Sequence, residues 1–176
     1  LNFIFYLGSS SDDPELAQWQ RAVSATMAKE GAYMRLQQEK PQTIGLALAS
    51  SPLAYAAWVL EKFNAWTDTN GRIENRFSKN ELLAQIMIPL VNDAVISAFW
   101  LYYGSGREKP AKARIDLPTG FAAFPGEIIP PPPRRLAELD FNISRWSIMN
   151  RGGHFAALEE PAAFANELAA FFDSFR

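Results

Sequence analysis

Two short runs decide the fold class, Thr119-Gly-Phe-Ala-Ala-Phe124 and Ile143-Ser-Arg-Trp-Ser-Ile-Met149. Their length and apolar content fit buried strands. Arg134 to Leu139 can form a helix between them, and Ala162 to Phe175 follows Pro161 with the apolar spacing of a helix. The tail therefore has the order strand, helix, strand, helix, which predicts parallel strands in an α/β fold. Because two parallel strands alone are marginally stable, we expect the tail to be one edge of a larger sheet, and thus an incomplete fold.

Helix-start signals recur through the first hundred residues. Asp12 or Asp13 before Pro14 can accept hydrogen bonds from free backbone N–H groups, and proline suits the first helical position. Ser78 and Glu81 have the spacing of a capping box, in which each side chain bonds the backbone N–H of the other. Together the signals predict four helices, at 14–30, in a short stretch from 41, at 52–66, and at 79–103 with proline 89 as the place for a bend.

The character of the sequence changes after Gly104 and Gly106, where basic residues lead into the first predicted strand. Glycines interrupt helices, and the periodicity of the apolar residues differs on the two sides of this point. The sequence therefore predicts two parts, a helical region at 1–105 and an α/β region at 106–176.

Composition excludes several classes of protein. The chain of 176 residues has 17 Lys+Arg against 19 Asp+Glu, so a nucleic-acid partner is not expected. Having 0 cysteines excludes disulfides, a thiolate zinc site and a cysteine nucleophile, but leaves the cellular compartment open. The apolar stretch 82–103 contains Asn92 and Asp93 near its centre, which favours a buried helix over a membrane span. The first residue is Leu1, so a missing beginning is expected.

A candidate acid–base pair follows the two predicted strands. His154, the only histidine, comes after the second strand in Arg151-Gly-Gly-His154-Phe155, and Glu127 comes just after the first. Parallel strands bring their carboxyl ends to one edge, where open α/β sheets bind ligands. A carboxylate bonded to one ring nitrogen raises the basicity of the other, as a general base requires. Taken alone, His154 could equally be a lone surface histidine, and Glu127 would more often be a solvated loop acid.

Several motifs along the chain resemble those of one known protein family. Arg151-Gly-Gly-His154-Phe-Ala-Ala-Leu-Glu159-Glu-Pro161 and Phe124-Pro-Gly-Glu127 resemble the carboxyl-terminal end of the microsomal-type epoxide hydrolases. This branch of the α/β-hydrolase superfamily includes the insect juvenile hormone enzymes. Lys40-Pro-Gln-Thr43, Trp58-Val-Leu-Glu-Lys-Phe63 and Leu101-Tyr-Tyr103 resemble the family's helical cap in the expected order. The resemblance implies a cap (lid) at 1–105 and the last strand–helix units of the core at 106–176.

The resemblance also implies a role for each matching residue. His154 would be the general base and Glu127 the acid that orients it, while Tyr33 and Tyr102 match the two cap tyrosines. A neutral phenol can donate a hydrogen bond to an epoxide oxygen and stabilise the alkoxide as the ring opens. Tyr103 is the rival of Tyr102, because adjacent helical residues do not point into one pocket. The implied substrate is a small hydrophobic epoxide, and no metal or organic cofactor is implied.

The aspartate nucleophile of the family, held on a strand–helix turn between His-Gly and Trp-Gly motifs, has no counterpart in the sequence, and neither does a G-x-S-x-G elbow. We therefore expect a carboxyl-terminal part of an epoxide hydrolase that forms no diol alone and needs the missing amino-terminal half of the fold. The alternative is a non-catalytic helical binding or interaction protein derived from a hydrolase. The oligomeric state is open, a homo-oligomer included.

Overall fold

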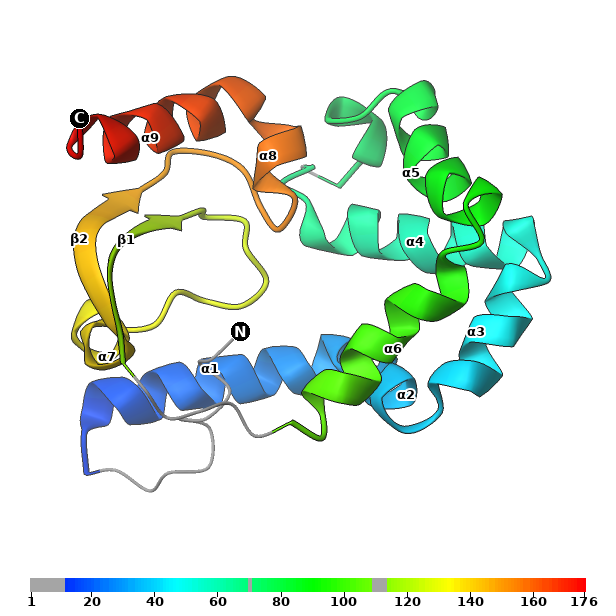
Figure 1. Cartoon of the computed structure of the whole chain (residues 1–176), viewed down its shortest axis with the longest axis horizontal. Coiled ribbons are helices and arrows are strands. Elements are labelled where there is room, and N and C mark those ends of the chain that lie inside the picture. Colours follow the sequence, from blue (N-terminus) through cyan, green and yellow to red (C-terminus); the bar gives the residue numbers. More distant parts are fainter. Residues whose placement is uncertain (1–11, 70, 109–113) are drawn as a thin grey trace. The chain divides into compact units, whose positions relative to one another are not determined.

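Helices make up the first part of the computed structural model, which describes residues 12–69, 71–108 and 114–176 (Figure 1). The helices before the sheet are α1 (Pro14–Glu30), α2 (Ala32–Glu39), α3 (Pro41–Ala49), α4 (Pro52–Trp66), the short 3-10 helix η2 (Ile73–Asn75), α5 (Lys79–Val91) and α6 (Val95–Ser105). The later elements are β1 (Ile115–Ala123), α7 (Arg134–Asp140), β2 (Phe141–Ile148), α8 (Ala156–Glu159) and α9 (Pro161–Asp173). The predicted helical first part and the predicted strand, helix, strand, helix order are both confirmed.

The capping signals work as predicted. Asp13 Oδ1 accepts hydrogen bonds from the backbone N–H groups of Glu15 and Leu16 at 3.0 and 3.2 Å. The Ser78 hydroxyl accepts from the Glu81 N–H at 3.3 Å, and the Glu81 carboxylate accepts from the Ser78 N–H at 2.7 Å, which completes the capping box. Side chains that satisfy free N–H groups thus fix where α1 and α5 begin.

The single helix predicted at 79–103 is wrong, because α5 and α6 are separate and meet at a bend of 86°. Pro89 lies inside α5, and the break comes after it, at residues 92–94. Asp93 has a φ of 52°, in the left-handed region, which an aspartate tolerates better than most residues. The polar pair Asn92 and Asp93 therefore marks the turn between two helices.

Helix α2 was missed by the prediction because a single residue, Gly31, separates it from α1. The Gly31 N–H still donates to the Met27 carbonyl at 2.9 Å, and a Cβ at Gly31 would lie 2.5 Å from the same oxygen. Only glycine fits this close approach, so the chain turns there without a loop.

The chain forms two compact units, and each is described by itself. The helical unit contains residues 27–65 and the described residues of 69–108, and α6 packs against α2 and α3 within it (Figure 1). Its core is a cluster of side chains that are at most 7% exposed: Leu48, Tyr55, Ile86, Val95 and Phe99. Burial of these side chains holds the helices together.

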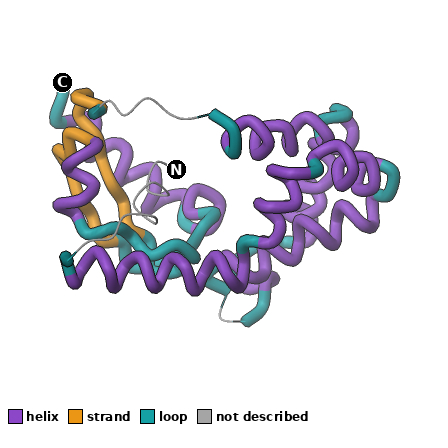
Figure 2. The backbone as a smooth tube through the Cα atoms, turned by 90° about the horizontal axis from the view of Figure 1, so that it is seen from below, coloured by secondary structure: helices purple, strands orange, loops and turns teal. Residues whose placement is uncertain are grey.

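The sheet unit contains residues 66–68 and the described residues of 12–26 and 114–176. In the described part of the chain, β1 and β2 form a parallel two-stranded sheet, coloured orange in Figure 2. Phe121 and Trp146 are paired across it with stacked rings 4.2 Å apart. Arg145 in β2 contacts Glu167 in α9 and donates hydrogen bonds to both of its carboxylate oxygens, at 2.5 and 2.8 Å. The domain division at residue 105 stays a prediction. The sheet unit also includes the part of α1 up to Thr26.

Within the described ranges, no single helix is long and apolar enough to cross a membrane, although the bent pairs α3 with α4 and α5 with α6 pass a test of length and composition.

Candidate active site

Two loops at the carboxyl ends of the strands carry the candidate acid–base pair. Glu127 lies four residues beyond the end of β1, and His154 lies six residues beyond the end of β2. The Gly126 N–H donates to the Gly152 carbonyl at 2.8 Å, and Gly126 and Gly153 pair as an isolated parallel bridge. The sheet pairing thus continues into the loops, which brings Glu127 and His154 to the same edge, as the sequence predicts.

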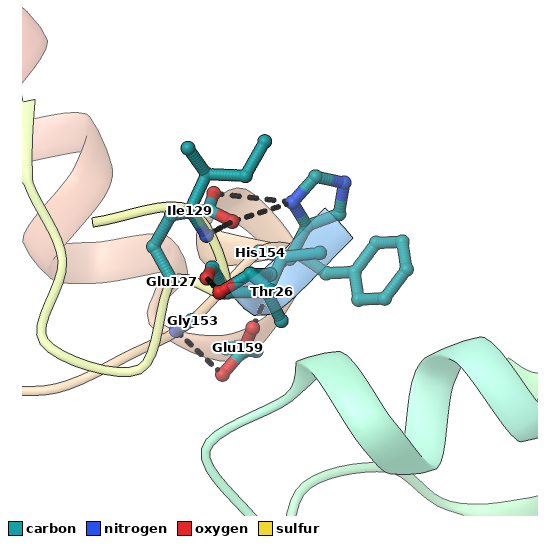
Figure 3. A network of polar contacts seen from close by, with 8 residues as sticks. Thr26, Glu127, Ile129, Gly153, His154 and Glu159 are labelled. Carbon is teal, nitrogen blue, oxygen red and sulfur yellow. Dashed lines mark hydrogen bonds and ion pairs between the residues drawn. The ribbon is translucent and has the colours of Figure 1, made fainter. Parts of the chain in front are cut away.

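The imidazole of His154 faces the carboxylate of Glu127 (Figure 3). Nδ1 lies 2.9 Å from Oε1 and 3.1 Å from Oε2, and the side chains are 36% and 30% exposed. A carboxylate accepts only, so this contact assigns a proton to Nδ1. The neutral ring then keeps the lone pair of Nε2 available to accept a proton from water.

Glu127 is held in its charged form. Burial acts to raise its pKa, but the hydrogen bond and the charge of His154, with the backbone N–H groups of Ile129 and Ile128, outweigh burial, so the pKa lies below its ordinary value. The Ile129 N–H donates to Oε1 at 3.3 Å. Hydrogen bonds to the ionised form are the cause of such a decrease. Glu127 can therefore orient the imidazole and stabilise an imidazolium at neutral pH.

This lowered pKa gives a pH-dependent prediction. The unfolded chain binds the proton on Glu127 more readily than the folded one, so the stabilisation is complete above the ordinary carboxyl pKa of about 4.3 and is lost as the pH falls through the lower folded value. We expect Glu127→Gln to cost about 1 kcal/mol near pH 7, since the pair is partly exposed. Urea unfolding of both proteins should show this difference shrinking below about pH 4, and a difference that grows there would contradict the assignment.

Two aromatic rings contact the imidazole. The Trp66 ring lies edge-to-face with it at 5.1 Å and the Phe155 ring at 5.2 Å. The backbone N–H of His154 donates to the Trp66 carbonyl at 2.9 Å, so the end of α4 also holds the loop. Ring packing and this backbone bond together restrict the orientation of the imidazole.

The two candidate tyrosines lie together in the helical unit. The rings of Tyr33 in α2 and Tyr102 in α6 are 5.8 Å apart, edge to face. The Tyr103 ring instead packs against Trp100 at 5.1 Å, with the Arg107 guanidinium 3.5 Å from its centroid. This arrangement favours Tyr102 over Tyr103 as the partner of Tyr33. The two tyrosines and the His154–Glu127 pair belong to different units, so their convergence on one cavity stays a prediction.

Three residues that support the loops were not predicted from the sequence. Trp19 donates through Nε1 to the Pro130 carbonyl at 2.9 Å, and Thr26 donates through its hydroxyl to the Ile128 carbonyl at 3.1 Å, so α1 fixes the chain after Glu127. Glu159 binds the loop of His154. The sequence contains no signal for Trp19 or Thr26, which lie more than one hundred residues from their partners, and Glu159 lies at the end of α8, which is too short for periodicity to reveal.

Among residues 12–69, 71–108 and 114–176, no three histidine or acidic side chains are grouped so that they could hold a metal ion.

The parallel strands with an acid and a histidine in the loops that follow define the carboxyl-terminal part of an α/β-hydrolase. The juvenile hormone epoxide hydrolase of the silkworm Bombyx mori superimposes with a TM-score of 0.81 at 26% identity, over 93% of this chain and 42% of that one. The predicted fold class is confirmed, and the chain matches only part of the complete fold.

Curated relatives of this chain are named epoxide hydrolases. The chain is 38% identical over 160 residues to a putative epoxide hydrolase of Stigmatella aurantiaca, and 36% identical over 177 residues to epoxide hydrolase 1 of Oryctolagus cuniculus. These alignments cover 89% and 94% of this chain, which spans only 36% and 39% of the relatives' length. No protein-family model matches. The chain is thus a homologue of the carboxyl-terminal part of the epoxide hydrolases, and the resemblance inferred from its motifs is confirmed.

Proposed function

We propose that this chain forms the cap and the last strand–helix units of an enzyme that adds water to an epoxide to give a vicinal diol. The observation that carries the proposal is the contact of His154 Nδ1 with the Glu127 carboxylate, 2.9 Å long, in a chain homologous to epoxide hydrolases. The substrate class is a small hydrophobic epoxide. The domain assignment of residues 1–105 to the cap and 106–176 to the core is part of the proposal.

The reaction has two steps. A carboxylate oxygen of an aspartate outside these 176 residues attacks an epoxide carbon, the ring C–O bond breaks, and the alkoxide takes a proton from solvent water. Tyr33 and Tyr102 donate hydrogen bonds to the oxygen on which charge develops. Their rings lie 5.8 Å apart, which supports a shared substrate oxygen. The product of this step is an alkyl ester of the enzyme.

The second step regenerates the carboxylate. Nε2 of His154 takes a proton from water while the water oxygen attacks the ester carbonyl, and Glu127 stabilises the imidazolium that forms. The acyl C–O bond then breaks, the departing oxygen takes the proton from the imidazolium, and the diol leaves. The carboxylic acid that remains releases its proton to solvent, which balances the proton taken up in the first step and restores the carboxylate. His154 and Glu127 act here as general base and orienting acid. A base without a nucleophile cannot form the ester, so this chain by itself is proposed to be inactive.

A chimera tests the proposal. In this chimera, the chain replaces the matching segment of the Stigmatella aurantiaca relative, to which it is 38% identical, so that the relative supplies the rest of the protein. We expect the chimera to convert styrene oxide to its diol and the 176-residue chain alone to give none. Gas chromatography of the product measures both. Diol formation by the chain alone would show that the nucleophile lies within it, and a folded chimera without activity would contradict the proposed function.

One observation supports the alternative, a non-catalytic binding protein. The helical unit contains a cavity of about 470 Å³ between α4, η2 and α5. Its apolar lining consists of Leu60, Ile73, Leu82, Leu83 and Ile86. Such a cavity could hold a hydrophobic ligand. A folded but inactive chimera, with tight binding of an apolar fluorescent probe by this chain, would favour the alternative.

A further inference from the structure

Glu159 is a buried acid in contact with the loop of His154. It is the last residue of α8 and is 7% exposed. Its Oε2 accepts hydrogen bonds from the backbone N–H groups of Gly153 at 2.9 Å and Asp68 at 3.0 Å, and its Oε1 accepts from the N–H of Phe155 at 2.9 Å. Figure 3 shows its carboxylate beside Gly153. One side chain therefore binds the residues on both sides of His154.

Asp68, the one donor outside the loop, connects the loop to the end of α4. Asp68 donates its N–H to Glu159, and its own carboxylate accepts the N–H of Gly152 at 3.3 Å. The N–H of His154, in the same loop, donates to the carbonyl of Trp66, the last residue of α4, at 2.9 Å. Every backbone N–H from Gly152 to Phe155 thus has an acceptor, and two of the four are on Glu159.

The packing leaves the loop little room to adjust. A Cβ at Gly153 would lie 2.7 Å from the Trp66 carbonyl oxygen and 2.9 Å from that of Gly126. Real Cβ atoms do not approach oxygen so closely, so the segments at Trp66, Gly126 and Gly153 are in direct backbone contact. In such a junction, three N–H groups that lost their acceptor could recover it only if the backbone moved or water entered.

A carboxylate suits this position better than an uncharged side chain. Burial of a charge is unfavourable unless hydrogen bonds compensate for it, and N–H bonds to a carboxylate are roughly twice as strong as those to a neutral acceptor. Each of the three donors is a backbone N–H, which fixes main-chain positions directly. An amide in place of the carboxylate would turn an N–H₂ group toward at least one of these donors.

We propose that Glu159 is a positioning residue that holds the imidazole of His154 against Glu127. The proposal rests on the proposed role of His154 as a base and adds the side chain that fixes its orientation. Glu159 acts through the backbone of Gly153 and Phe155 and touches no reacting atom. When it is replaced, the loop relaxes and the contact between Nδ1 and Glu127, 2.9 Å in this structure, is lost in part of the molecules.

The test is ¹⁵N NMR of the imidazole in the purified 176-residue chain, where the single histidine makes the assignment unambiguous. Spectra are taken at a pH at which the ring is neutral. We expect one tautomer, with the proton on Nδ1, in the unmodified chain and in Glu160→Gln. Glu160 is the matched control, because it is the adjacent glutamate and its carboxylate pairs with Arg151 at 3.3 Å.

In Glu159→Gln, which preserves the shape of the side chain, we expect a mixture of both tautomers, similar to that of Glu127→Gln. Glu159→Ala should show the same change more strongly, and the glutamine variant decides the question if the alanine variant does not fold. A folded Glu159→Gln with the Nδ1-protonated tautomer intact, whatever its melting temperature, would overturn the proposal and leave Glu159 a purely structural role. The spectrum requires no catalysis, so an inactive chimera would refute the proposed function without affecting this result.

Discussion

His154→Ala in the chimera is expected to lower the rate of diol formation from styrene oxide by about 10²–10⁴-fold, the contribution of a positioned general base. Alanine removes the nitrogen that takes a proton from water, while the other residues that bind the epoxide remain. The rate of ester hydrolysis should therefore fall, with little change in the rate at which the ester forms. Single-turnover and steady-state kinetics with the same substrate separate the two rates.

The control for His154→Ala is Arg151→Ala. Arg151 lies three residues earlier in the same loop, is 65% exposed, and pairs with Glu160. Because this side chain is mostly in water, its removal should leave both rates nearly unchanged. Equal losses in the two variants would point to a disturbed loop and would contradict the assignment of His154 as the base.

Tyr33→Phe and Tyr102→Phe form the second prediction with a large effect. Each substitution removes one hydroxyl donor and keeps the ring, so the packing at 5.8 Å between the two rings is preserved. Loss of one donor to a developing oxyanion slows reactions by about 10²–10³-fold. We expect a loss of this size in the rate of ester formation for each variant, measured by single-turnover kinetics in the chimera, and no effect on ester hydrolysis.

Tyr103→Phe provides the matched comparison. Tyr103 is adjacent in α6, but its ring packs against Trp100 and Arg107. This variant should retain nearly full activity. If Tyr103→Phe were the slow variant and Tyr102→Phe the active one, the choice of Tyr102 as the second donor would be wrong.

Local signals made much of the fold predictable from sequence. Asp13 before Pro14 and the pair Ser78 and Glu81 act through hydrogen bonds between residues at most three apart, so the sequence alone reveals them. The parallel pairing of β1 and β2 was predicted from the helix between them, since parallel strands need a crossover connection and that connection is usually a helix. The predicted pairing of Glu127 with His154 followed from that topology.

Features that depend on single residues or distant contacts were not predictable. Gly31 and Asp93 interrupt helices over one to three residues, where periodicity remains almost unchanged. Glu159 resembles a surface acid in sequence, and only tertiary contact with Asp68, 91 residues away, shows that it is buried. The partner of Tyr33 was ambiguous between Tyr102 and Tyr103, and the packing of α2 on α6 favours Tyr102.

The proposed function depends most on His154, which would activate the water that hydrolyses an alkyl ester of the enzyme. Intact-protein mass spectrometry of the His154→Ala chimera after exposure to styrene oxide tests it most directly. We expect the protein to accumulate with the added mass of one epoxide molecule, because the ester forms and is not hydrolysed. An inactive His154→Ala protein that remains entirely unmodified, beside an active unsubstituted chimera, would contradict it.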